Sequence, residues 1–269
     1  MSKALIGTWN VAFDQYRWIY TFYEGGTVTW RDPNNGKKGG GTWSDKGSAV
    51  VIGWKGSTTK ETWPTPIKPG DQAGNLVADW GSGWSTASKK QDSFDGFAAE
   101  GQLDAYACWA ACLSWYTKVQ PNIPTVPQRQ ILFGSDPRIW AANGAITPNG
   151  LMTISLPNVV MERSRIVQAA LEGRVRARKF PMLIGFSSGP MGGHVNVIHG
   201  FDEASGNVSV MEPWFPDPAK DNSYEFLEGN FWKKKTRTPF KFTGQMTKRQ
   251  LSYYTSRPLG GEFIVGHRI

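Results

Sequence analysis

Short alternating runs of apolar and polar residues, separated by turns rich in Gly, Asn and Asp, make up residues 5–64. Alternation with a period of two places every second side chain on one face of a strand, and the Gly- and Asn-rich turns favour hairpins. This pattern predicts an antiparallel β-meander that forms a small β-barrel or sandwich. The clearest strands are expected over residues 9–13, 18–22, 28–30 and 49–54.

Tryptophan is concentrated in the same part of the chain, since eight of the thirteen Trp residues lie before residue 85. In a small all-β unit, such side chains most often fill the core. Alternatively, exposed rings would form a stacking surface for a sugar, a peptide or a base. The sequence leaves both interpretations open.

The periodicity changes beyond this Trp-rich region. Residues 65–99 are rich in Gly, Ser, Pro, Asp and Lys and show little periodicity, which predicts a linker or a loop draped over one domain. Apolar spacing then predicts helices over residues 107–119 and 161–178, followed by strands. We therefore expect an α+β chain with a β domain and trailing linker over residues 1–88 and a second domain over 89–269. Strands of the second domain are expected over residues 182–186, 194–201 and 208–212, with more within 226–242 and 262–267.

The net charge of +8 is spread along the chain: residues 1–90 carry eleven Lys and Arg against seven Asp and Glu, and residues 91–269 carry nineteen against fifteen. Without a polarised basic arm, this balance does not indicate nucleic-acid binding. Two basic runs, residues 174–179 and 233–237, are typical of solvated surface, or alternatively of a docking surface for an acidic partner.

No apolar stretch is long enough to predict a membrane span. The first residues also lack the apolar segment and cleavage site of a secretory signal. We therefore expect the protein in the cytoplasm, or exported without a cleavable signal peptide by effector-type secretion.

The chain has two cysteines, Cys108 and Cys112, which lie four residues apart on the first predicted helix. One helical turn between them is an awkward geometry for a disulfide, so both are expected to be thiols. Cys108 opens the helix, where the partial positive charge of the N-terminus favours a thiolate nucleophile. Cys112 lies one turn deeper, which is typical of a buried structural thiol. Gln102, six residues upstream of Cys108, can offer an amide N–H to an oxyanion near the sulfur.

His194 opens a predicted strand, and a second predicted strand ends at Glu212. The two positions have the same parity, so an antiparallel pairing centred near residue 203 would place their side chains next to each other on one face. A carboxylate in this place fixes the tautomer of the imidazole and stabilises its protonated form. Asp202 is the alternative orienting residue, although an aspartate in a turn is more often a turn former.

These elements, in this order, resemble the papain-like cysteine proteases: Gln-x5-Cys-Trp, then Gly-His at the head of a strand, then an acidic residue followed one position later by Trp. The bacterial effector branch, which pathogens inject into plant cells, is the most similar. The resemblance covers residues 97–269 and implies a helical half followed by an antiparallel sheet. It implies Cys108 as nucleophile, His194 as general base and acid, and Glu212 as orienting residue. Gln102 and the Cys108 backbone N–H would form the oxyanion hole.

The resemblance implies a cysteine endopeptidase that acts on protein or peptide substrates, plausible as a bacterial effector or toxin and in need of no cofactor. A departure is Glu212, because the family usually has Asn or Asp there. The substrate-binding surface is expected to include Trp109, Gly192, Gly193 and Trp214. The adjacent glycines let a substrate approach the backbone closely, and the ring of Trp214 could shield the histidine–carboxylate hydrogen bond. The β domain would serve recognition, delivery or self-inhibition.

Three other functions compete with this prediction. The same site residues would serve a glutamine deamidase or transglutaminase. The Trp-rich β domain could instead belong to a non-enzymatic binding protein. Finally, Cys108, Cys112, His194 and His199 match the spacing of a two-cysteine, two-histidine zinc site. However, residues 194 and 199 are an odd number apart and would point to opposite faces of a strand. His199 and His267 are therefore expected to be structural.

Overall fold

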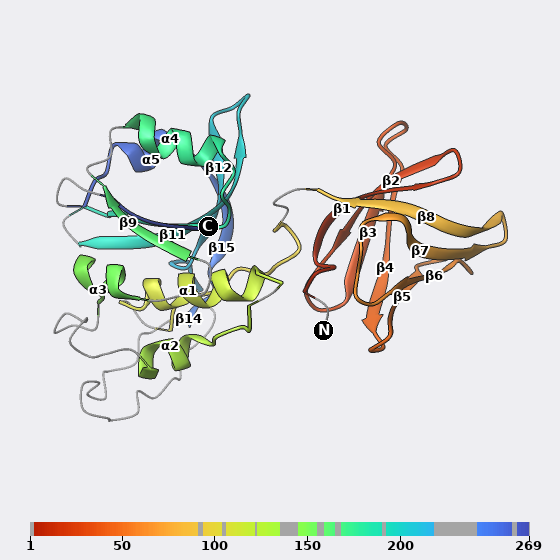
Figure 1. Cartoon of the computed structure of the whole chain (residues 1–269), viewed down its shortest axis with the longest axis horizontal. Helices are drawn as coiled ribbons and strands as arrows, with labels where there is room; N and C mark the ends of the chain where they lie inside the picture. Colours follow the sequence, from red (N-terminus) through yellow and green to blue (C-terminus); the bar gives the residue numbers. More distant parts are fainter. Residues whose placement is uncertain are drawn as a thin grey trace. The chain divides into compact units, whose positions relative to one another are not determined.

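The chain folds into two compact units, residues 1–98 and 99–269 (Figure 1). The computed structural model describes residues 3–90, 94–103, 106–121, 123–134, 145–154, 159–164, 168–189, 192–217, 241–259 and 263–268. The first unit extends beyond the boundary expected at residue 88. In the described part of the chain, no helix is long and apolar enough to cross a membrane.

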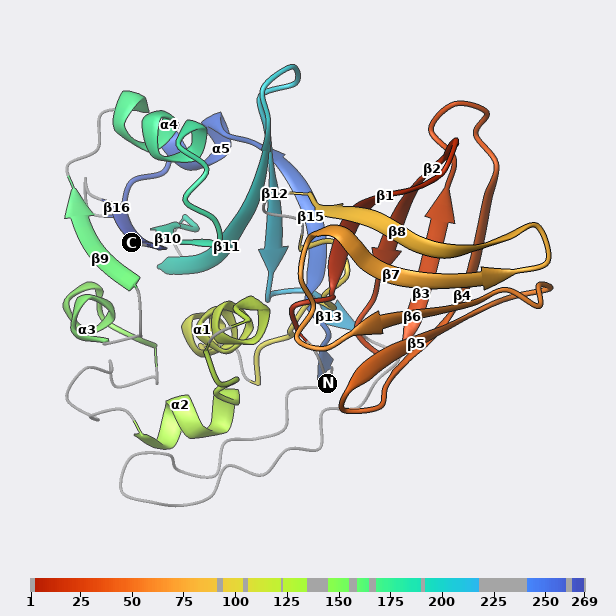
Figure 2. The same ribbon diagram turned by 45° about the vertical axis from the view of Figure 1, so that its right-hand side comes forward.

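The first unit is a closed antiparallel barrel of eight strands, in which each strand pairs with the next and β8 pairs back with β1 (Figure 2). The predicted meander is therefore confirmed, and the barrel is the architecture it adopts. The strands are β1 (Gly7–Phe13), β2 (Tyr16–Phe22), β3 (Thr27–Arg31), β4 (Lys38–Asp45), β5 (Ala49–Trp54), β6 (Lys60–Pro64), β7 (Gly70–Ala78) and β8 (Gly81–Lys89).

The predicted linker over residues 65–99 was wrong, because β7 and β8 complete the barrel there. Their inward positions carry small side chains such as Ala73, Ser85 and Ala87, which give no hydrophobic periodicity. Small residues are required because large rings from neighbouring strands fill the interior. A Cβ at Gly74, for example, would lie 2.5 Å from Nε1 of Trp63. Because their inward side chains are small, β7 and β8 lack the alternation of apolar and polar residues that predicts a strand.

Large aromatic side chains and one carboxyl group fill the barrel. Trp9 and Trp63 are buried and meet edge to face, with ring centroids 5.2 Å apart. Glu61 is also fully buried, and its carboxyl group accepts hydrogen bonds from Trp63 Nε1 (2.8 Å) and the Tyr20 hydroxyl (3.2 Å). Burial raises the pKa of Glu61 to about 7, although hydrogen bonds from its neighbours oppose the shift.

Not all the tryptophans of the barrel lie in the core. Trp9, Trp43 and Trp63 are buried, whereas Trp80 is 48% and Trp84 is 44% exposed. Trp80 also contacts the exposed ring of Tyr16, with centroids 4.9 Å apart. The core-filling interpretation is therefore confirmed for the three buried rings, and the stacking surface stays a prediction.

The second unit contains a six-stranded antiparallel sheet with the order β15-β12-β11-β10-β16-β9. Figures 1 and 2 show α1, α2 and α3 on one side of this sheet and α4 and α5 on the other. Coverage on both sides explains why nearly every residue of β10 is buried. The elements are α1 (Cys108–Val119), α2 (Gln128–Gly134), α3 (Pro148–Thr153), β9 (Val159–Ser164), α4 (Gln168–Arg176), β10 (Met182–Ser187), β11 (Gly193–Asp202), β12 (Asn207–Glu212), β13 (Pro216–Asp217), β14 (Lys241–Phe242), β15 (Gln245–Gln250), α5 (Ser252–Thr255) and β16 (Phe263–Arg268).

The first predicted helix and the three predicted strands over residues 182–212 are confirmed. The second predicted helix was wrong in its first part, because residues 159–164 form β9 and only 168–176 are helical. β9 pairs with β16 along its whole length, and this long-range pairing overrides the local helical spacing. Most of the strand region expected within 226–242 lies outside the described residues.

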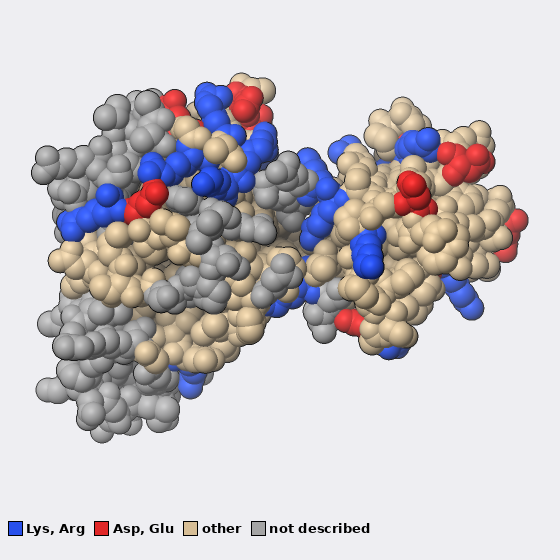
Figure 3. Space-filling model, viewed as in Figure 1, with Lys and Arg blue, Asp and Glu red and all other residues tan. Residues whose placement is uncertain are grey.

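Basic side chains of the second unit gather near α4, β12 and β15 on the face drawn in Figure 3. Two residues of the first basic run are paired: Arg174 contacts Glu162, and Arg176 lies 3.9 Å from Glu203. This pairing fits an ordinary solvated surface. The second run, residues 233–237, lies outside the described residues.

Candidate active site

Cys108 is the first residue of α1, as predicted. Every residue of this helix except Lys118 is buried, and Cys108, at the helix end, retains 9% exposure. The preceding residue, Ala107, forms no side-chain cap, so the helix N-terminus presents its N–H groups and its partial positive charge beside the sulfur.

His194 lies near the start of β11 and connects the sulfur to a carboxylate. Its Nε2 is 2.5 Å from Oε1 of Glu212. Because Nε2 faces this carboxylate, Nδ1 is the ring nitrogen left for Cys108, whose proximity raises the pKa of the imidazole. The ring of Phe186 supports the imidazole edge to face, with centroids 5.6 Å apart. The imidazole is therefore held between the thiol and the carboxylate.

The surroundings of His194 favour its protonated form. Burial by itself lowers the pKa of the imidazole, but the charge and hydrogen bond of Cys108 and those of Glu212 outweigh burial and raise the pKa to about 10. Conversely, hydrogen bonds and the positive charges of His194 and Arg249 overcome burial and lower the pKa of Glu212 below its usual value. Glu212 is therefore ionised at neutral pH, and Nε2–H of His194 is the donor.

Glu212 reaches His194 from a register that differs from the predicted one. Val197 pairs with Met211 and Ile198 with Val210, so the pairing is centred at residue 204 and not at 203. Continued in this register, Glu212 lies opposite Asn196 and diagonal to His194. The shared face was predicted correctly, because the shift is by two residues. A diagonal neighbour is farther away, and the long glutamate side chain spans that gap.

Arg249, on β15, is a site residue that the sequence did not indicate. Its Nη2 donates to Oε2 of Glu212 over 2.7 Å, and its Nη1 donates to Oδ1 of Asn196 over 3.3 Å. Oδ1 of Asn196 also accepts a hydrogen bond from the Tyr254 hydroxyl (2.9 Å). The guanidinium group lies 4.7 Å from the ring centroid of Tyr253. No motif points to Arg249, because only the pairing of β15 with β12 brings it near the carboxylate.

Gln102 lies beside the segment that follows Glu212. It is 2% exposed, and its backbone N–H donates to the carbonyl of Pro213 over 3.2 Å. Gln128 fixes the same loop: its Oε1 accepts from the Leu103 N–H (3.2 Å), and its Nε2 donates to the Gly101 carbonyl (2.8 Å). Gln128 therefore positions the loop of Gln102, a role that the sequence did not indicate. The oxyanion-hole role of Gln102 stays a prediction.

The four residues expected to bind substrate differ in their placement. Gly192 and Gly193 are exposed next to His194, and Gly192 has a left-handed φ of +106° that favours glycine. Trp214 is 40% exposed, and its ring packs on Phe242 with centroids 4.7 Å apart. Trp109 is a correction: it has no exposed surface, because as the second residue of the central helix it packs into the core.

Trp214 was also expected to shield the hydrogen bond between His194 and Glu212. Its observed contribution is through the backbone, because its N–H donates to Oε1 of Glu212 over 2.9 Å. The alternative orienting residue, Asp202, is exposed in the β11–β12 turn and accepts from the Ala204 N–H and the Ser205 hydroxyl. Asp202 is thus a turn former, and Glu212 is the carboxylate at the imidazole.

Cys112 and His199 belong to the core of the second unit. Cys112 is fully buried, and its thiol donates to the Val195 carbonyl over 3.2 Å. Burial, together with nearby Cys108 and carboxylates, raises the pKa of the Cys112 thiol well above its ordinary value. Burial lowers the pKa of His199 to about 4, and its ring centroid lies 5.5 Å from that of Trp115. The His267 side chain lies outside the described residues.

Neither cysteine forms a disulfide. Within the described ranges, no group of three or more His, Cys, Asp and Glu side chains is arranged to hold a metal ion. Cys108, at the start of α1, instead lies in a row with His194 and Glu212.

Cys108, His194 and Glu212 come from α1, β11 and β12, and they form a continuous chain of polar contacts. No family model, curated protein or solved structure matches this chain. Chemically, such a series can accept a proton from the thiol and stabilise the resulting imidazolium, because the imidazole lies between the sulfur and a carboxylate.

Proposed function

We propose that this chain is a cysteine hydrolase, and more specifically a cysteine endopeptidase that cleaves peptide bonds of protein substrates. One observation carries the proposal: His194 lies between Cys108, which is close enough to raise the pKa of the imidazole, and the Glu212 carboxylate, to which its Nε2 donates. A nucleophile, a base within hydrogen-bonding reach and a third group that orients the base are the parts that covalent catalysis by a thiol requires.

In the first half of the reaction, His194 takes the proton of the Cys108 thiol and the sulfur attacks the carbonyl carbon of the peptide bond. The oxyanion that forms accepts hydrogen bonds from the Cys108 backbone N–H and the Gln102 side-chain amide. Each such donor contributes about 3 kcal/mol to lowering the barrier. The tetrahedral intermediate then collapses: the C–N bond breaks, His194 protonates the leaving amine, and a thioester remains on Cys108.

In the second half, His194 accepts a proton from water, and the hydroxide attacks the thioester carbonyl. The C–S bond breaks, the carboxylic acid product leaves, and the Cys108 thiolate is restored beside the imidazolium. Glu212 keeps the imidazole in the orientation that both halves need, and Arg249 and the Trp214 N–H hold Glu212.

The arrangement of the second unit supports a papain-like class, with a buried helix that begins at the cysteine and an antiparallel sheet that carries the histidine and the acid. Exposed aromatic surface at Trp214 and Phe215, next to Glu212, suits the side chains of a peptide substrate. An effector or toxin role, in the cytoplasm or after export without a cleavable signal, is part of the same proposal.

The first prediction is that Cys108→Ala abolishes peptidase activity while the fold survives. Loss of the nucleophile leaves only binding and oxyanion stabilisation, so the rate should fall by at least about 1000-fold. Activity would be measured as new peptide termini in a treated proteome, and the fold by near-ultraviolet circular dichroism. Mass mapping after reaction with a thiol-directed epoxide should find the label on Cys108 of the wild-type protein.

Cys112→Ala is the matched control, because Cys112 is fully buried and should neither take the label nor be needed for activity. Full activity of the Cys108→Ala variant would contradict the proposal. Deamidated or cross-linked glutamines in place of new termini would assign the site to a deamidase or transglutaminase. Failure of the epoxide to react with Cys108 would favour a non-enzymatic binding protein.

A further inference from the structure

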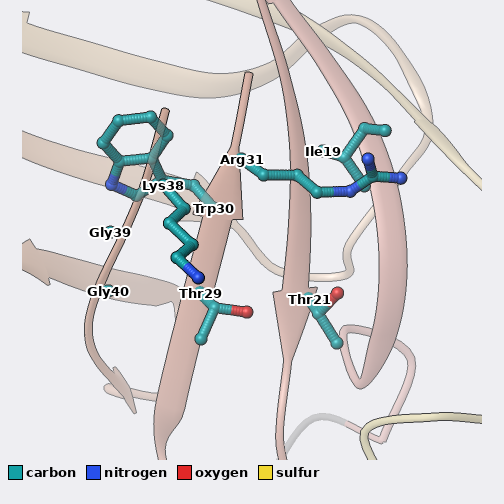
Figure 4. Close-up of a pocket in the computed structure, with 8 residues that line it drawn as sticks. All are labelled: Ile19, Thr21, Thr29, Trp30, Arg31, Lys38, Gly39 and Gly40. Atoms are coloured by element: carbon teal, nitrogen blue, oxygen red, sulfur yellow. The ribbon is translucent and has the colours of Figure 1, made fainter. Parts of the chain in front are cut away.

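A groove on the outer wall of the barrel is lined by residues that do not belong to the candidate active site. It has a volume of about 520 Å³ and is formed by β2, β3 and β4 (Figure 4). Tyr20 and Val28 point into the barrel and are buried, so the adjacent odd-numbered positions on β2 and β3 point outward. Ile19, Thr21, Thr29 and Arg31 occupy these positions and line the groove together with Lys38 and Gly40.

Strand register arranges these side chains in two rows. Ile19 pairs with Arg31 and Arg31 with Lys38, and in the next row Thr21 pairs with Thr29 and Thr29 with Gly40. Gly40 has no side chain, so the space beside Lys38 and Thr29 stays open. Figure 4 shows Lys38 extending toward Thr29, and Arg31 extending toward Ile19. Two cations and two hydroxyl groups therefore face the same groove, together with the apolar side chain of Ile19 and the ring of Trp30.

Arg31 and Lys38 lie directly opposite each other on β3 and β4, although their charged ends extend to different sides of the groove. Like charges directly opposite each other on neighbouring strands are destabilising. Among the described residues, no carboxylate forms an ion pair with either cation. The nearby carboxylate of Asp32 instead accepts from the Asn34 N–H and the Asn35 side chain. A bound anion between the two cations would turn this repulsion into attraction.

We propose that the groove binds an acidic, extended segment of a partner protein. A carboxylate lies between Arg31 and Lys38, and the Thr29 hydroxyl donates to the same or a neighbouring acidic residue, whereas the Thr21 hydroxyl is hydrogen-bonded to that of Thr8. Three strands span about 10 Å and two rows of residues about 7 Å, which suits two or three peptide residues better than a single inorganic ion. Ile19 supplies apolar contact for the methylene groups of an acidic side chain.

The second prediction tests this groove with a fluorescein-labelled hexaglutamate peptide and the full-length chain carrying Cys108→Ala, which leaves the probe intact. Fluorescence anisotropy should show binding that weakens as salt is raised. The double variant R31Q/K38Q should bind at least about tenfold more weakly, because two charged donors are lost. The matched double variant K46Q/K60Q removes the same charge from exposed lysines outside the groove and should bind like its parent.

Equal weakening in both double variants would overturn the proposal, because it would mean attraction by net charge alone. Equal binding of a hexaglutamine peptide would overturn it as well, as would selective binding of inorganic phosphate or a single-stranded oligonucleotide in place of hexaglutamate. The test requires neither the Cys108 thiol nor catalysis, so the groove and the proposed peptidase stand or fall separately.

Discussion

The carboxylate of Glu212 accepts hydrogen bonds from three segments of the chain: the His194 imidazole, the Trp214 backbone N–H and the Arg249 guanidinium. Two of these donors carry positive charge, which keeps the carboxylate ionised in a mostly buried place. The ionised carboxylate in turn raises the pKa of His194. At the scale of single residues, Glu212 thus both orients the imidazole of His194 and raises its pKa.

The third prediction is that Glu212→Gln moves the alkaline limb of the pH–activity profile to lower pH. The pKa of folded His194 lies above its ordinary value, so the imidazolium and the stability it contributes are complete below about pH 6.5 and are lost as pH rises through about 10. The Gln amide removes one negative charge beside the imidazole, so the pKa of His194 falls. The imidazolium is then lost at a lower pH than in the wild type. The rate should also drop on the order of 100-fold.

The measurement is the pH dependence of kcat/KM, together with the His194 ring-proton titration by nuclear magnetic resonance. Glu212→Asp is the control, because it keeps the charge but not the length. A titration of His194 that is the same in the wild type and the Gln variant would contradict the prediction.

At the scale of elements, the site depends on how four parts of the second unit pair and pack. α1 contacts β11, which is tied to it through the hydrogen bond from the Cys112 thiol to the Val195 carbonyl. β11 pairs with β12, and β12 pairs with β15, which carries Arg249. Two successive strand pairings therefore bring Arg249, on an outer strand of the sheet, into contact with Glu212.

The fourth prediction concerns Arg249 as a positioning residue. Arg249→Met removes the donor to Oε2 of Glu212, and kcat should fall by about tenfold. The pKa of Glu212 should rise toward its ordinary value. Ionised Glu212 stabilises the fold at neutral pH, and this contribution is lost as pH falls through the pKa of the folded state. In the variant that pKa is higher, so the contribution is lost at a higher pH. The acid limb of the kcat profile therefore moves upward.

Arg249→Lys should restore part of the rate and return the acid limb toward the wild-type position, because the charge is kept although the paired donors are not. A purely structural role for Arg249 would lower the amount of folded protein and leave the pH profile in place. Urea unfolding of both variants separates the two effects.

At the scale of the whole molecule, the chain has two compact units whose cores differ in chemistry. The barrel encloses the Glu61 carboxyl group among aromatic rings, whereas the second unit buries a sheet between helices on both sides. The buried acid makes the stability of the first unit depend on pH between about 4.5 and about 7.

The fifth prediction is that the barrel becomes less stable as pH rises from about 4.5 to about 7. Folded Glu61 keeps its proton up to about pH 7, whereas the unfolded chain loses it near the ordinary value of 4.5. The folded state therefore binds more protons in this interval, and the free energy of unfolding falls by about 3 kcal/mol. Glu61→Gln should remove this dependence.

Urea unfolding at pH 5 and pH 8 would test the prediction, with Trp fluorescence reporting chiefly on the barrel and alkylation of buried Cys112 reporting on the second unit. The difference between the wild type and the Gln variant cancels the titration of all other groups. A wild-type barrel as stable at pH 8 as at pH 5, relative to the variant, would contradict it.

Local patterns predicted much of the fold. The first strands of the barrel, the helix that begins at Cys108 and the central strands of the second unit follow from periodicity and turn residues, which depend on neighbours in the chain. β7, β8 and β9 did not follow. The first two have small inward residues that only make sense against Trp63, and the third is a strand because β16 pairs with it.

By itself, the sequence determined the order and spacing of Cys108, His194 and Glu212, and the parity that places the last two on one face, because these are properties of neighbouring positions along strands and helices. Only the tertiary structure decided the register, the contact of Arg249 with the carboxylate and the burial of Trp109. The physical reason is that register and burial are set by packing between residues far apart in the chain, and such packing leaves no local periodicity to read.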